Sequence, residues 1–110
     1  MEYRRLGKTE FRISEISLGA WQIGGTWGSG FDAANAEAVA EAAIDQGVNF
    51  IDTADIYEDG QSEAAVARVA KRSSQRIYVA TKCGRGIQPH DDEHYTPAAL
   101  RASVEKSLQN

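Results

Sequence analysis

The run Val48-Asn-Phe-Ile-Asp52, continued by Thr-Ala-Asp-Ile-Tyr57, decides the fold of this chain. It is an apolar segment that ends in an acid and passes into a polar loop. A second run of the same kind, Ile77-Tyr-Val-Ala-Thr-Lys82, ends in an amine. Short apolar runs with polar boundaries are typical of buried strands. Because helical patterns precede and follow both runs, we expect parallel strands joined by right-handed helical crossovers.

The rest of the chain supplies a hairpin, one more strand and three helices. The hairpin is predicted near the start, where two short strand-like runs flank a loop that contains Gly7. The following strand leads into a glycine-rich loop that also carries Trp21 and Trp27. We predict strands at residues 3–6, 11–13, 16–21, 48–52 and 77–82, and helices at about 33–46, about 62–72 and from 97 onward.

The expected helix boundaries rest on capping residues. Asp32 is expected to cap the first helix, and Gly47 to end it. Either Asp59 or Ser62 is expected to cap the second helix. Thr96, followed by a proline, is the preferred start of the third. The apolar faces that these helices should bury are Val39, Ala43 and Ile44 on the first, Ala65, Val66 and Val69 on the second, and Leu100, Val104 and Leu108 on the third.

An alternation of strands and helices at this spacing can close in two ways. The sheet is either doubly wound or part of a (β/α)8 barrel, of which this chain holds three βα units. A complete barrel needs about 200–250 residues or more, so the 110 residues of this chain cannot form one. Residues 1–110 are therefore expected to form one α/β domain without an internal repeat or linker.

Composition favours a soluble cytoplasmic protein and excludes several function classes. The net charge is −4 and the basic residues are scattered, so we expect neither nucleic acid nor a membrane as a partner. The first ten residues lack the apolar segment of a signal peptide, and no apolar run approaches the roughly 20 residues that span a bilayer. The single cysteine, Cys83, cannot form an internal disulfide, which is typical of a reducing compartment.

The side chains at the strand ends have the chemistry to move a proton onto a carbonyl oxygen. Alternation along a strand puts Asp52 and Lys82 on the inward faces of two neighbouring strands, roughly 5 Å apart at the carboxyl edge. Tyr57 lies in the following loop and can fold over the same edge. A neighbouring ammonium makes a phenol a stronger acid, because it stabilises the phenolate. With Asp52 keeping Lys82 charged, Tyr57 is the candidate general acid.

In order and spacing, these segments resemble the aldo-keto reductase family. The resemblance rests on Leu-Gly-Ala-Trp21, Gly-Val-Asn-Phe-Ile-Asp-Thr-Ala-Asp-Ile-Tyr57, Gly-Gln-Ser-Glu63 and Tyr-Val-Ala-Thr-Lys82, and it covers essentially the whole chain. It implies an N-terminal part of a TIM barrel, with the hairpin closing the bottom. It also implies that Tyr57 is the proton donor, Lys82 its partner and Asp52 the partner of Lys82. The implied cofactor is NADPH, with Gly19, Ala20, Trp21 and Asp52 near its nicotinamide end.

The implied function is NADPH-dependent reduction of a small aldehyde or ketone to an alcohol. The family's catalytic histidine and the loops that hold the adenosine phosphate would follow Asn110, so the isolated chain is expected to lack appreciable reductase activity. Two alternatives stay open, a cofactor-sensing regulatory subunit of a membrane channel and a non-catalytic fragment. Substrate identity and the choice between NADPH and NADH would be set by later residues. We also expect the free edge of the third core strand to promote self-association.

Other chemistry-bearing residues favour plainer interpretations. Trp21 and Trp27 would either line a pocket for apolar carbonyl substrates or pack under their loop. His90 and His94 flank three acidic residues, but a solvated polar loop is favoured over a metal site or a substitute for the family's histidine. Cys83 alternates to the opposite side of the strand from Lys82, which favours a packed thiol over a nucleophile. The glycines do not form a GxGxxG fingerprint, which disfavours a Rossmann fold.

Overall fold

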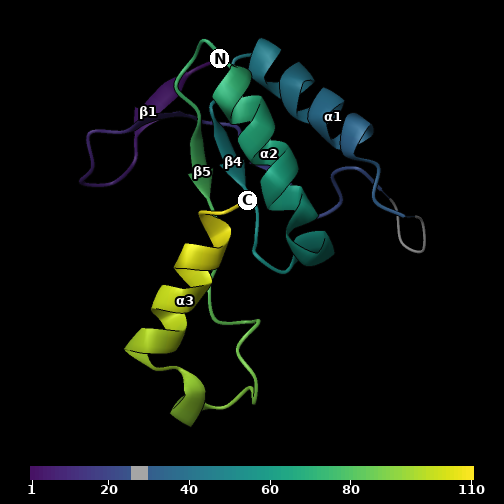
Figure 1. The fold of residues 1–110 in the computed structure, drawn as a ribbon. Helices are drawn as coiled ribbons and strands as arrows, with labels where there is room; N and C mark the ends of the chain where they lie inside the picture. The colour runs from purple at the N-terminus through teal and green to yellow at the C-terminus, as the bar shows by residue number, and fades with distance from the viewer. Residues whose placement is uncertain (26–29) are drawn as a thin grey trace.

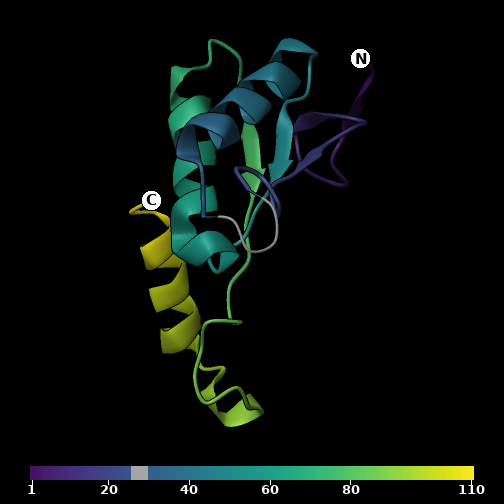
Figure 2. The same ribbon diagram turned by 90° about the vertical axis from the view of Figure 1, so that its right-hand side faces the viewer.

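A three-stranded parallel sheet carries two helices on one side, and a separate two-stranded hairpin lies on the other (Figures 1 and 2). The computed structural model describes residues 1–25 and 30–110. The expectation for Trp27 therefore lies outside the described residues. The elements are β1 (Tyr3–Arg5), β2 (Arg12–Ser14), β3 (Leu18–Gly19), α1 (Ala33–Asp45), β4 (Phe50–Asp52), η1 (Tyr57–Gly60), α2 (Gln61–Arg72), β5 (Tyr78–Ala80), η2 (Asp92–His94) and α3 (Pro97–Ser107).

The sheet has the strand order β3-β4-β5, with both pairings parallel. Gly19 lies opposite Asp52, and Asp52 lies opposite Ala80, so the three strands end at one common edge. α1 connects β3 to β4, and α2 connects β4 to β5. The predicted α/β fold, a hairpin followed by parallel βα units, is confirmed.

The hairpin is attached to the amino end of β4. Its antiparallel strands pair Tyr3 with Ser14. Ser14 N donates to Asn49 Oδ1 at 2.7 Å, and Asn49 N donates to Ser14 Oγ at 3.1 Å. Tyr3 Oη donates to the Gly47 carbonyl at 2.8 Å. These bonds place the hairpin at the end of the sheet opposite to the edge where Asp52 lies.

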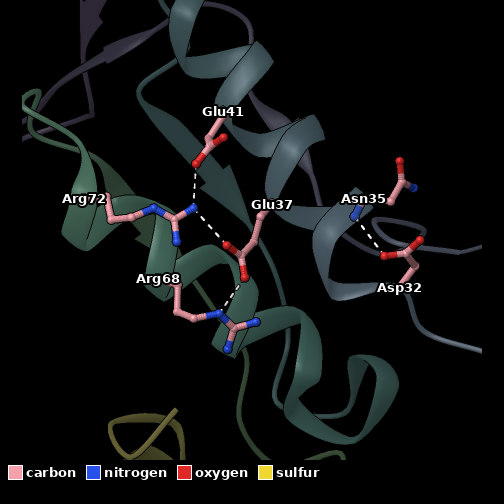
Figure 3. Close-up of polar contacts among 6 residues, drawn as sticks. All are labelled: Asp32, Asn35, Glu37, Glu41, Arg68 and Arg72. Carbon is pink, nitrogen blue, oxygen red and sulfur yellow. Dashed lines mark hydrogen bonds and ion pairs between the residues drawn. The ribbon is translucent and has the colours of Figure 1, made fainter.

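The capping predictions for α1 and α3 are confirmed. The Asp32 side chain accepts a hydrogen bond from Asn35 N at 3.0 Å, as Figure 3 shows. Gly47 follows α1 with a φ of 92°, a conformation that glycine adopts without strain. At α3, the Thr96 side chain accepts from a first-turn amide, and Pro97 occupies the first helical position.

The capping prediction for α2 is wrong. The helix follows Gly60, which has a φ of 87° and provides no capping side chain. Asp59 has a φ of 52°, whereas a capping residue needs extended backbone. Ser62 lies one residue inside the helix, where its hydroxyl bonds to the end of β3. Neither of the two side chains that were predicted to cap α2 therefore does so.

The core lies between the sheet and the two helices. Ile51, at the centre of β4, is fully buried in one cluster with Val66 of α2. On α1 the predicted burial of Ile44 is confirmed, but that of Val39 is wrong, since Val39 is 41% exposed. The residues of α1 that face the core, spaced by four, are Ala36, Ala40 and Ile44. Alanine at two of these positions lets α1 lie close to α2.

Ion pairs join α1 and α2 along their exposed rim (Figure 3). Arg68 Nε donates to Glu37 Oε1 at 2.6 Å. Arg72 Nη2 lies 2.8 Å from Glu37 Oε2 and 2.5 Å from Glu41 Oε1. Hydrogen bonds from Arg68 and then Arg72 lower the pKa of the Glu37 carboxyl. The pairs bridge the two helices above a core of alanine, isoleucine and valine.

α3 does not cover the sheet. In both ribbon views it extends beyond the end of the strands, away from α1 (Figures 1 and 2). Its predicted apolar face is therefore not buried, and Val104 and Leu108 are 50% and 81% exposed. On β5, Val79 is 46% exposed, and no described strand pairs with the free edge of β5. No helix in the described part of the chain is long and apolar enough to cross a membrane.

Candidate functional site

Two of the site residues predicted from the sequence meet at the carboxyl edge of the sheet. Asp52 is the last residue of β4, and Lys82 lies two residues beyond β5. Lys82 Nζ donates one hydrogen bond to Asp52 Oδ1 at 2.7 Å and another to the Thr53 carbonyl at 2.8 Å. Both side chains are about half exposed. The ammonium is held between a carboxylate and a carbonyl, and hydrogen bonds to such acceptors favour its charged form.

Tyr57 joins this pair through its ring. Lys82 Nζ lies 5.1 Å from the centroid of the Tyr57 ring, a distance typical of a cation–π contact. The hydrogen bond to Asp52 raises the pKa of the Lys82 ammonium, burial opposes that rise, and Tyr57 adds a smaller contribution in the same direction as Asp52. Lys82 is therefore a cation at neutral pH, next to a phenol.

The chain turns sharply directly after Tyr57. Glu58 and Asp59 have φ values of 48° and 52°, and Gly60 follows at 87°. A left-handed conformation costs a residue with a Cβ roughly 1–2 kcal/mol. Sequence reasoning predicted only a polar loop here, although Asp and Gly adopt this conformation more often than most residues. The three left-handed residues fix the position of Tyr57 relative to the start of α2.

Polar side chains are buried just below the edge. Thr53 and Ser62 are both fully buried, with their hydroxyl oxygens 2.9 Å apart. Ser62 Oγ donates to the Ala20 carbonyl at 2.9 Å. Glu63, which is 6% exposed, accepts a hydrogen bond from the Thr81 hydroxyl. Sequence reasoning missed these roles, although the adjacent Ser and Glu at the start of an apolar helix were a usable signal.

Gly19, the last residue of β3, and the two residues that follow it reach the same edge. Ala20 is fully buried; its N donates to the Asp52 carbonyl at 2.8 Å, and its carbonyl accepts from Ser62 Oγ. Gly19 is exposed, and a Cβ built on it would meet no described atom within 4 Å. Trp21 is 57% exposed, so this residue lies outside the buried core. The open space over Gly19 can accept a flat ring.

The prediction of a packed thiol at Cys83 is wrong, because this side chain is exposed. β5 ends at Ala80, so strand alternation does not extend to Cys83. The thiol instead lines a pocket of about 330 Å³, together with Val104 and Leu108 of α3.

The two histidines lie in the exposed loop before α3. His94 Nδ1 lies 2.6 Å from Asp91 Oδ1, and His90 Nδ1 lies 3.3 Å from Tyr95 Oη. Within residues 1–25 and 30–110, no three metal-ligating side chains come together. This loop is a solvated polar segment, and neither histidine joins the Asp52–Lys82 pair.

Sequence comparison places this chain among known proteins. The Aldo/keto reductase family profile matches residues 15–110. The aldo-keto reductase YhdN of Bacillus subtilis is 37% identical over 112 residues, and a probable voltage-gated potassium channel subunit beta of Oryza sativa subsp. japonica is 34% identical over 112 residues. Each match covers 99% of this chain but only 34% and 33% of the relative. The chain thus spans about a third of the length of these relatives.

Solved structures agree with the sequence comparison. The aldo-keto reductase AKR11C1 from Bacillus halodurans, in its holo form, matches with a TM-score of 0.80 and 28% identity, over 99% of this chain and 36% of that one. An aldo-keto reductase from Klebsiella pneumoniae in complex with NADPH matches with a TM-score of 0.65 and 28% identity, over 89% of this chain and 31% of that one. The hairpin and βα units correspond to the N-terminal part of these barrels. This chain belongs to the aldo-keto reductase family.

Proposed function

We propose that Asp52, Tyr57 and Lys82 form the acid–base part of the active site of an NADPH-dependent oxidoreductase. Its substrate would be a small aldehyde or ketone, which it reduces to an alcohol. The observation that carries this proposal is the position of the Lys82 ammonium, 2.7 Å from Asp52 Oδ1 and 5.1 Å from the Tyr57 ring centroid. Membership of the aldo-keto reductase family supports it.

In this mechanism, Tyr57 donates the proton. A carbonyl oxygen placed against the Tyr57 hydroxyl receives that proton as negative charge develops on the oxygen. The Lys82 ammonium then stabilises the remaining phenolate, because the two charges are opposite and close. Asp52 holds the ammonium in place and raises its pKa, so Lys82 takes part in the reaction as a cation.

The proposed cofactor site uses Gly19, Ala20, Trp21 and Asp52 at the nicotinamide end of NADPH. The open space over Gly19 and the exposed ring of Trp21 support this assignment, since a nicotinamide is a flat ring that needs an unobstructed approach. The NADPH complex of the Klebsiella pneumoniae relative supports the choice of cofactor. When bound, NADPH supplies the hydride that reaches the carbonyl carbon.

We assign residues 1–110 to one barrel domain that they do not complete. The chain covers about a third of its relatives, and the edge of β5 pairs with no described strand. The exposed side chain of Val79 on that strand agrees with this assignment. A further barrel strand would pair with the free edge of β5, and the outer ring of helices would cover its outer face.

A second candidate function is a cofactor-sensing regulatory subunit. The similarity to the rice potassium channel subunit beta favours it. The two functions use the same residues, because cofactor binding and carbonyl reduction meet at one edge of the sheet. They differ in turnover, which a sensor does not need.

A fusion protein tests the proposal. Residues 1–110 replace the matching third of YhdN and are joined to the remainder of that protein. We expect the fusion to oxidise NADPH in the presence of a nitrobenzaldehyde, whereas the isolated chain should show no appreciable turnover. The absorbance of NADPH measures both rates, and its fluorescence reports binding. A fusion that binds NADPH without oxidising it would contradict the enzymatic proposal and favour the sensor.

A further inference from the structure

The first turn of α2 is bonded to the end of every strand in the sheet. Ser62 Oγ donates to the Ala20 carbonyl beyond β3 at 2.9 Å. The same oxygen lies 2.9 Å from Thr53 Oγ1, just past β4. The neighbouring Glu63 accepts from the Thr81 hydroxyl, just past β5. Two adjacent helical residues therefore contact three strand ends, all at the edge that carries the proposed site.

The direction of these bonds can be assigned from the number of protons. Each hydroxyl has one proton to donate. Since the Ser62 proton points to the Ala20 carbonyl, the bond between the two hydroxyls must run from Thr53 to Ser62. Thr53 and Ser62 are fully buried, so water cannot replace a lost partner. The result is a directed chain from β4 through α2 to β3.

Thr53 connects this chain to the ammonium of Lys82. Its carbonyl accepts from Lys82 Nζ at 2.8 Å, and its amide donates to the Ala80 carbonyl at 2.8 Å. It also directly follows Asp52, the second acceptor of Lys82. A shift of Thr53 therefore moves both oxygens that hold the ammonium.

We propose that Ser62 is a positioning residue, which holds Thr53 in place and thereby keeps Lys82 aligned with Asp52. Ser62 touches neither the Lys82 ammonium nor the Tyr57 ring in the contacts described above, so it acts through Thr53. The catalytic consequence rests on the proposed reductase function. The alignment of Lys82 itself does not, and it can be measured in the chain of residues 1–110.

The chain offers a matched control for Ser62. Ser14 is also buried, at 2% exposure, and its hydroxyl donates to the Ile16 carbonyl at 2.7 Å and accepts from Asn49 N at 3.1 Å. It is the last residue of β2 in the hairpin and contacts the opposite end of β4. Ser14→Ala therefore removes a comparable buried hydroxyl without touching the edge that holds Lys82.

The test follows the side-chain ammonium of Lys82 by nitrogen-15 NMR, with the signal assigned from its absence in Lys82→Arg. Ser62→Ala should speed the exchange of these protons with water about fivefold, the effect of losing roughly one net hydrogen bond. Thr53→Val should act in the same direction and, because it keeps the side-chain shape, serves if Ser62→Ala does not fold. Ser14→Ala should leave the exchange rate unchanged.

Wild-type exchange in both Ser62→Ala and Thr53→Val would overturn the proposal, as would equal acceleration by Ser14→Ala. In the fusion with YhdN, Ser62→Ala should lower kcat and leave the Kd of NADPH unchanged. A fusion without any turnover would refute the reductase function, whereas the NMR result would still decide the role of Ser62.

Discussion

Replacing Ile51 and Val79 by alanine, one at a time, tests how differently the two strands are covered. The residues are register partners on one side of the sheet. Ile51 is fully buried under the helices, whereas Val79 is 46% exposed. Ile51→Ala deletes three carbon atoms from a packed site and should cost about 2–5 kcal/mol of unfolding free energy. Val79→Ala deletes two carbons that are half in water and, at about 0.8 kcal/mol per buried carbon, should cost less than about 1 kcal/mol.

Urea unfolding followed by circular dichroism measures both losses as shifts of the midpoint at constant slope. A domain of this size is typically stable by about 5–15 kcal/mol, so Ile51→Ala takes a large part of the total. If that variant does not fold, Ile51→Val should cost about 0.5–1.5 kcal/mol and serves instead. Equal losses at the two positions would mean that the outer face of β5 is covered in solution, which contradicts the exposed position of Val79.

The remaining predictions concern the ion pair, a left-handed glycine and the strand edge. Asp52→Asn should lower the pKa of Lys82, because the hydrogen bond to Asp52 is the largest cause of its raised value. Carbon-13 NMR titration of Lys82 Cε measures this pKa, and an unchanged value would contradict the Asp52–Lys82 pair. The pKa of Lys82 in the folded protein lies above its ordinary value of 10.5. The ion pair with Asp52 therefore stabilises the fold fully below pH 10.5, and this stabilisation is lost as the pH rises through the folded pKa. Gly60→Ala should lower the free energy of unfolding by about 1–2 kcal/mol, because Gly60 has a φ of 87°. Gly19→Ala should change it by no more than about 0.5 kcal/mol, since an added Cβ meets open space. Similar thermal unfolding of the two variants would contradict this. The free edge of β5 should make the chain associate with rising concentration, and a monodisperse monomer in light scattering at high concentration would count against that.

Capping residues predicted the ends of α1 and α3 from the sequence, whereas packing between distant segments decided which face of a helix is buried. Asp32, Gly47 and Thr96 act on backbone groups a few residues away, so their roles follow from the sequence alone. The buried face of α1 does not, because alanine is common on both faces of that helix. Only the neighbouring α2 selects Ala36 over Val39 for the core.

In the candidate site, too, some contacts follow from the sequence and others depend on packing between distant segments. Asp52 ends β4 and Lys82 follows the parallel neighbour β5 by two residues, so their meeting at the common carboxyl edge follows from the topology of the sheet. Cys83 was misplaced because alternation stops where β5 ends, a boundary set by pairing with β4 and not by composition. The contact between Thr53 and Ser62 depends on how α2 turns back over the sheet through Gly60, a path that no periodicity encodes.

Tyr57→Phe in the fusion with YhdN tests whether Tyr57 donates the proton beside Lys82. The substitution removes only the hydroxyl and keeps the ring, which lies 5.1 Å from Lys82 Nζ. Fluorescence titration should show an unchanged Kd for NADPH, while kcat for a nitrobenzaldehyde should fall about 100-fold to 10,000-fold, the range for loss of a general acid. Turnover equal to that of the unmodified fusion would mean that Tyr57 is not the proton donor.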